Sequence, residues 1–126
     1  MVLALRGMKK GTEQGLGLTT QLDTEAAAVT AVAYTSSGAI NDADNYVTIA
    51  TNEAAYTLAQ PRVGRLLVIS ESGAAAGGIT VTCTVGTFDG TNSIATFNAA
   101  SETLVLLGIS STRWLIVANI GAVALS

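Results

Sequence analysis

The sequence contains no histidine and a single cysteine among its 126 residues. A cysteine–histidine nucleophile pair is therefore excluded, and one thiol cannot form a disulfide within the chain. The cysteine stands in the run ITVTCTV, whose alternation places Cys83 on one strand face with Ile79, Val81 and Val85. This pattern predicts a small, buried core residue at Cys83 rather than a reactive thiol.

Charge and long apolar runs are also scarce. Charged residues make up 12% of the chain, with 6 basic against 9 acidic residues and a net charge of −3. Nucleic-acid binding needs clustered cations that replace phosphate counterions, and the only adjacent pair is Lys9-Lys10, so we expect no nucleic-acid partner. No apolar run approaches the roughly 20 residues of a membrane helix. The start, MVLALRGMKK, has no basic region before an apolar one, so we expect no membrane span and no signal peptide.

Hydrophobic residues, by contrast, make up 49% of the chain. A single domain of this length with so few charges carries more apolar surface than it can comfortably bury alone. Large exposed apolar patches usually mark contacts with other chains. The composition therefore indicates a protein that works in an assembly.

The main secondary-structure signal is a series of short β-like runs from Tyr46 onward. They are separated by Gly, Asn, Ser and Asp at a spacing of about 8 to 12 residues. We predict strands within residues 46–51, 54–59, 64–72, 78–86, 93–99, 102–110, 113–120 and 122–126. The lone proline, Pro61, lies between two of these runs, where a missing backbone N–H costs nothing. The pattern predicts an all-β fold, a single domain that is a β-sandwich or a barrel.

The first part of the chain reads differently. Residues 1–24 have no sustained period and predict an irregular N-terminal arm, which leaves residues 25–126 for the sandwich domain. The segment TEAAAVTAVAYTSS is ambiguous, because its alanines favour a helix whereas Val29, Val32 and Tyr34 favour a strand. We favour the strand.

Two polar segments that contain acidic residues are candidate sites. In TVGTFDGTNSIATF, Asp89-Gly90 lies between two runs of alternating residues. Glycine adopts a positive φ easily, and the side chain of aspartate can accept a hydrogen bond from a backbone N–H that follows it in the chain. This predicts a hairpin turn rather than a catalytic acid or a ligand.

In NDADNYVTIATNE, three acidic residues take positions 1, 3 and 12 of a calcium-loop spacing: Asp42, Asp44 and Glu53. Tyr46 and Val47 then stand where such a loop needs a ligand and a glycine. An exposed turn before a strand is therefore the favoured interpretation, with calcium as the alternative. We expect no cofactor, no metal and no catalysis.

Two segments resemble phage proteins. TLVLLGISSTRWLIVANIGAVALS, residues 103–126, resembles the ending of small β-rich virion proteins of tailed bacteriophages. AAYTLAQPRVGRLLVISESGAAAGGITVT, residues 54–82, is similar to a strand–loop–strand pattern in phage head-decoration and tail-fibre modules. The resemblance spans about residues 45–126 and implies a β-sandwich or jelly roll, often trimeric, that binds a virus particle without catalysis.

The size of one globular domain with an arm favours a capsid decoration, or cement, protein on the exterior of the virion head. A tail-fibre or baseplate receptor-binding module is the alternative, and a small metal- or sugar-dependent enzyme is a distant third. The expected partners are the major capsid protein and further copies of the chain, in a homotrimer. The predicted oligomer contact consists of Arg113, Trp114, Leu115 and Val117. The predicted capsid-contact arm consists of Val2, Leu3, Leu5, Arg6, Lys9 and Lys10.

Deleting residues 2–10 should leave the fold and the oligomer intact but weaken capsid binding, because the apolar tip of the arm is expected to fill a groove between capsid subunits. Raising the salt to about 0.5 M should weaken binding only modestly, since exposed ion pairs contribute about 0 to 1 kcal/mol each. Co-sedimentation with empty capsids measures both effects. Unchanged capsid affinity after the deletion would show that the arm is a frayed terminus.

Overall fold

A computed structural model describes residues 30–73 and 78–126, and all regular structure within them is β. Residues Ala31–Ser126 form one compact unit. In the two described ranges there is no helix long and apolar enough to cross a membrane. The all-β prediction is confirmed, and the arm predicted for residues 1–24 lies outside the described residues.

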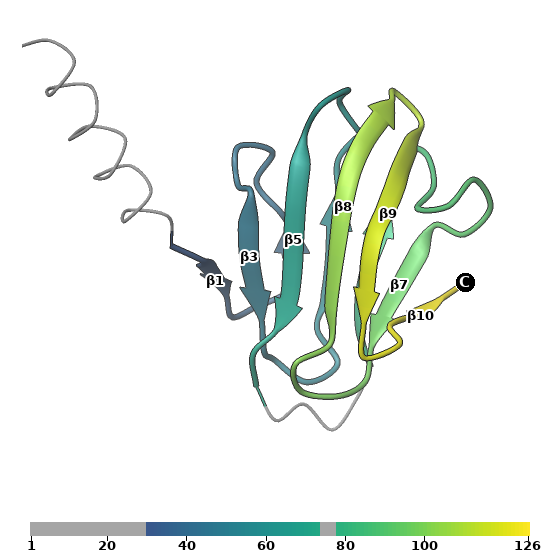
Figure 1. The fold of residues 1–126 in the computed structure, drawn as a ribbon. Coiled ribbons are helices and arrows are strands. Elements are labelled where there is room, and N and C mark those ends of the chain that lie inside the picture. The colour runs from purple at the N-terminus through teal and green to yellow at the C-terminus, as the bar shows by residue number, and fades with distance from the viewer. Residues whose placement is uncertain (1–29, 74–77) are drawn as a thin grey trace, which may run out of the picture. The chain divides into compact units, whose positions relative to one another are not determined.

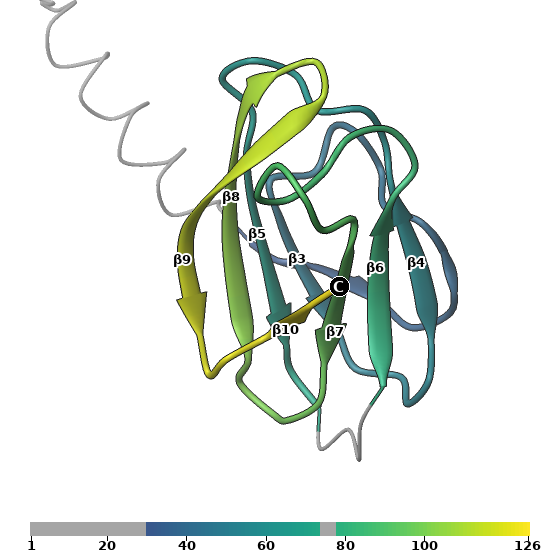
Figure 2. The ribbon, with the colours of Figure 1, turned by 90° about the vertical axis from the view of Figure 1, so that its right-hand side faces the viewer.

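Two five-stranded sheets pack face to face (Figures 1 and 2). The first sheet has the strand order β1-β3-β5-β8-β9 and the second has the order β10-β7-β6-β4-β2. The strands are β1 (Val32–Tyr34), β2 (Gly38–Ala39), β3 (Tyr46–Ile49), β4 (Ala55–Leu58), β5 (Leu66–Glu71), β6 (Ile79–Cys83), β7 (Ile94–Phe97), β8 (Thr103–Ser110), β9 (Arg113–Ile120) and β10 (Ala124–Leu125). The predicted sandwich is confirmed.

Each of the eight predicted runs contains one observed strand, from β3 to β10. Strand β1 falls in the ambiguous alanine-rich segment, so the strand preferred there is confirmed for its described part. Pro61 lies between β4 and β5, as predicted. Only the two-residue strand β2 had no counterpart in the prediction, because two residues are too few to show a period.

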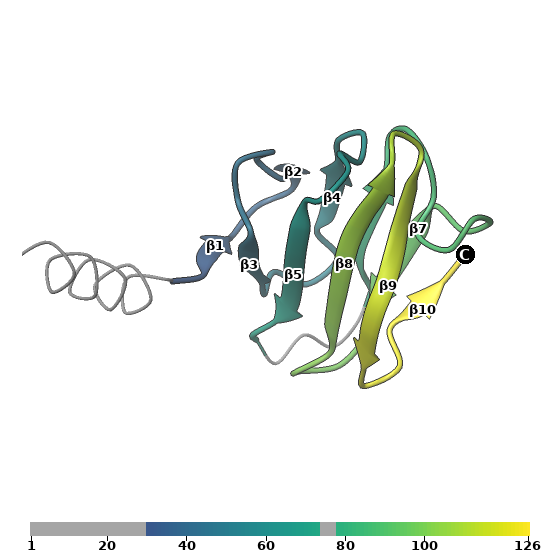
Figure 3. The same cartoon turned by 45° about the horizontal axis from the view of Figure 1, so that its top comes forward.

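The direction of the strands differs from an antiparallel jelly roll. From β1 to β6 the chain alternates between the two sheets, and Figure 3 shows this path from β1 to β5. Among these strands, each runs parallel to the next one in its own sheet. Four of the eight strand pairs among the described residues are parallel. Parallel neighbours need a crossover connection, and here a strand of the opposite sheet serves as that connection.

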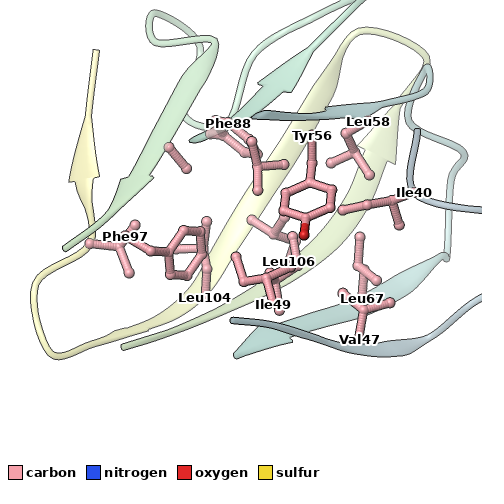
Figure 4. Packing of buried hydrophobic residues seen from close by; sticks show 14 of the residues in the cluster. Ile40, Val47, Ile49, Tyr56, Leu58, Leu67, Phe88, Phe97, Leu104 and Leu106 are labelled. Carbon is pink, nitrogen blue, oxygen red and sulfur yellow. The ribbon is translucent and has the colours of Figure 1, made fainter. Parts of the chain in front are cut away.

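The core lies between the inner faces of the sheets (Figure 4). Tyr56 and Phe97 come from strands of the second sheet, and Leu104 and Leu106 of β8 face them from the first. Phe88 is also fully buried, although it belongs to the connection between β6 and β7. Burying such apolar surface stabilises the fold by roughly 25 cal/mol per Å².

Cys83 is the last residue of β6 and is buried, as the alternation predicted. Burial raises the pKa of its thiol to about 12, which keeps the thiol protonated at neutral pH. Val85, predicted to share this buried face, is exposed. That part of the prediction is wrong because β6 ends at Cys83 and the alternation ends with it.

Buried ionisable side chains hold loops at both ends of β5. At its start, the Nη1 atom of Arg65 lies 2.9 Å from Asp42 Oδ1. Its Nη2 atom donates to the carbonyls of Asn41 and Asp44. Its guanidinium also lies 5.6 Å from the ring centroid of Trp114. Burial lowers the pKa of Arg65, and the charge of Asp42 opposes this shift.

At the other end of β5, the buried Glu71 accepts a bond from the backbone of Gly73. The buried Glu102 accepts one from Asn98 at 2.9 Å. These ionisable side chains therefore form hydrogen bonds with backbone N–H and C=O groups of the loops. The apolar core offers no such partners to these groups.

Asp42 pairs with two arginines, which provides a matched test. Arg65→Met should destabilise the fold by about 3 kcal/mol, because a buried cation and its hydrogen bonds to the carbonyls of Asn41 and Asp44 are lost. Arg62→Ala should cost less than about 1 kcal/mol, since this pair with Asp42 is exposed to solvent. Urea denaturation of both variants measures the difference. Equal losses would contradict the structural role of Arg65.

Candidate interaction surface

The outward side of the first sheet carries rows of apolar side chains across neighbouring strands. Leu66 lies beside Leu107, and Leu107 beside Leu115. In the next row Val68 lies between Tyr46 and Val105. We define the apolar face as Tyr46, Leu66, Val68, Val105, Leu107, Leu115, Val117, Ala118 and Ile120.

Solvent reaches much of the apolar face. Leu66 is 48% exposed, Leu115 is 41% exposed, and Val117 and Ile120 are each 55% exposed. No member of the face is charged. A contiguous apolar surface of this kind typically marks a site of interaction with another molecule.

The outward side of the second sheet gives an internal comparison. There Thr57 lies beside Thr82, and Thr80 lies beside Thr96. Threonine favours strands as valine and isoleucine do, yet its hydroxyl can bond to water. The fold is therefore compatible with a polar outer sheet, and folding of one chain does not account for the apolar face.

Strand β9 forms one edge of the first sheet, and this edge is obstructed. Val105 opposes Ala118 while Leu106 opposes Ile116, so Val117 is an extra residue in a β-bulge. Near the start of β9, the backbone of Trp114 donates to Thr87 at 2.9 Å. Bulges and covering loops hinder the addition of another strand. The face of the sheet is therefore a better contact surface than its β9 edge.

The predicted contact residues on β9 are divided by the alternation of the strand. Trp114 is fully buried in the core, so the prediction that its ring lies at a subunit contact is wrong. Leu115 and Val117 point to the opposite side and belong to the apolar face, where a contact stays a prediction. Arg113 is exposed, and its guanidinium lies close to Gly90 of the same chain. The six predicted arm residues lie outside the described residues.

The three acidic residues with calcium-loop spacing do not converge. Asp42 binds Arg62 and Arg65, as described above. Asp44 Oδ2 accepts a bond of 2.6 Å from the hydroxyl of Tyr34, whose pKa is raised by burial and by this bond. Glu53 lies beyond the other end of β3. Within the part of the chain that the structure describes, no group of three or more His, Cys, Asp or Glu could hold a metal.

A second candidate surface lies at the end of the sandwich, around the turn before β5. Two open hollows of about 490 and 630 Å³ flank this turn, and both are lined by Asp42, Arg62 and Val63. Val63 is 77% exposed at the tip. The turn packs against β8 at Gly108, where a Cβ atom would overlap the carbonyl of Arg62. The sequence showed no signal for these hollows, since they arise from loops that meet only in the fold.

Asp89 organises the connection between β6 and β7. Its Oδ1 atom accepts from the backbone of Thr91 at 2.9 Å and of Asn92 at 2.7 Å. The bonds from Asn92 and Thr91 lower the pKa of Asp89. Gly90 has a φ of 93°, and β6 pairs antiparallel with β7. The turn prediction is confirmed, although the connection is longer than a tight hairpin because Phe88 is anchored in the core.

No protein-family model matches the chain, and no curated protein matches it either. The resemblance to phage virion proteins therefore rests on the two quoted segments. The apolar face does not depend on this resemblance, because it follows from the pairing of the strands in the first sheet.

Gly90→Val should lower the melting temperature more than Asp89→Ala. Gly90 has a positive φ, and an added Cβ would lie 3.4 Å from the guanidinium carbon of Arg113. Asp89→Ala removes bonds that are local to the turn. Thermal denaturation measures both. Loss of partner binding in Asp89→Ala with unchanged stability would show that Asp89 has a role beyond the turn.

Proposed function

We propose that the chain is a structural protein of a tailed-phage virion, a capsid decoration protein that binds and stabilises the head shell as a homo-oligomer. The observation that carries the proposal is the uncharged apolar face of the first sheet. A sandwich with such a surface is suited to lasting contacts with other chains. The resemblance of residues 45–126 indicates the kind of assembly.

A decoration protein acts by preferring the assembled shell. A molecule that binds the assembled shell, and not its dissociated or unfolded subunits, raises the apparent stability of the shell by mass action. The sandwich is suited to this role because buried side chains hold its loops at both ends of β5. A preorganised binder loses little conformational entropy when it docks.

A receptor-binding module of a tail fibre or baseplate is the second candidate. The hollows beside Asp42 and Arg62 favour it, because loops at one end of a β-sandwich commonly carry binding sites. In this case the protein would bind a component of the bacterial surface rather than the shell.

The two candidates separate in one binding experiment. Purified protein is mixed with expanded empty capsids, with capsids already saturated by the same protein, or with bacterial cells. We expect co-sedimentation with the empty capsids only, together with a higher melting temperature of the shell. Binding to cells but not to capsids would overturn the decoration function in favour of the receptor module.

A further inference from the structure

We infer that the apolar face is covered by a second copy of this chain, so that the first sheet forms the subunit contact. The inference deepens the proposed function and rests on it for the expectation of a homo-oligomer. It names the surface through which the copies meet.

Three neighbouring strands of the first sheet are apolar on both of their sides. Strand β5 begins LLVI, β8 contains LVLL and β9 contains WLIV, all continuous apolar runs. Such runs are typical of strands that are buried on both faces, whereas strands with one solvated face alternate. Strand β6, ITVTC in the second sheet, does alternate. Figure 2 shows the second sheet on one side of the first, so one side of these three strands remains to be covered.

The two sides of these strands carry similar pairs of side chains. On the inner side Leu67 lies beside Leu106, and both are fully buried in the core. On the outer side Leu66 lies beside Leu107 in the same geometry. Sheets that pack face to face interdigitate side chains of this kind at a separation of about 10 Å. A partner with the chemistry of an apolar sheet therefore fits the outer side, and a second copy presents that chemistry.

The lack of charge on the apolar face also favours a second copy as the partner. A contact about a two-fold axis brings the same surface patch of two copies together, so charges on that patch would face like charges. No member of the apolar face is charged, and the nearby ionisable residues Glu71 and Arg113 lie at strand ends. The face can therefore meet a copy of itself without repulsion.

The area of the apolar face can be compared with that of a stable subunit contact. Strands β8 and β9 have eight residues each, which is roughly 26 Å of strand, and adjacent strands are about 4.8 Å apart. The footprint of the face from β3 to β9 is therefore on the order of 400–500 Å². Protruding side chains expose more area than their footprint. A stable contact takes about 800 Å² from each partner. The footprint, which includes the polar row of Thr48, Ser70 and Thr103, is therefore about half of that area, so the face supplies the centre of such a contact and the surface around it supplies the rest.

The test is the mass of the particle in solution for matched variants. Leu115→Glu places a charge on the apolar face, and Thr57→Glu places the same charge on the outer side of the second sheet. Sedimentation velocity at about 10 µM should show an oligomer for the wild type and for Thr57→Glu. Leu115→Glu should shift toward the monomer, with a dissociation constant raised at least about tenfold. Circular dichroism checks that each variant is folded, and Val117→Lys at the exposed bulge replaces Leu115→Glu if the latter is not.

Every outcome decides the inference. A monomeric wild type, or folded face variants that remain fully oligomeric, would overturn it. A monomeric wild type whose capsid binding is lost in Leu115→Glu would assign the apolar face to the capsid protein instead. An oligomer that is disrupted by Leu115→Glu but that binds no capsids would support the inference while the proposed function fails.

Discussion

Side chains along a β-strand point alternately to the two sides of its sheet, and the rest of this structure depends on that constraint. In β5 and β8 it sends Leu67, Ile69, Leu104 and Leu106 into the core. The same constraint sends the residues between them to the outside, where Leu66 is among the most exposed. Strands made almost wholly of apolar residues therefore build a dry core and an apolar outer face at once. The core is buried within one chain, whereas the outer face is left open to solvent.

The charged residues complement this arrangement by their placement. The described ones lie in loops or at strand ends, away from the middle of either sheet. Arg65 and Glu71 close the two ends of β5, where loop carbonyls and amides need partners that an apolar core cannot supply. The two sheet surfaces are left uncharged, one lined by threonines and the other by aliphatic side chains. This division gives the sandwich one side suited to water and one suited to an apolar partner.

Local signals in the sequence were sufficient for much of this description. The alternation in ITVTC predicted the buried position of Cys83, and the Asp89-Gly90 pair predicted a turn, because both depend on residues adjacent in the chain. The eight strands from β3 onward were predicted for the same reason. The apolar composition also indicated contacts with other chains, but it did not show which residues would make them.

The tertiary structure decided what depends on distant residues. The parallel pairing of β3 with β5 and of β4 with β6 could not be read from alternation, which is the same for either strand direction. Trp114 and Leu115 were placed together at a contact from their neighbouring positions, but the packing of β9 sends one into the core and the other outward. The apolar face likewise exists only once β3, β5, β8 and β9 lie side by side. The sequence alone determined the strands, the turns and the excess of apolar residues, whereas the pairing of the strands decided which side of the protein carries that excess, because sheet neighbours are set by long-range hydrogen bonds and packing.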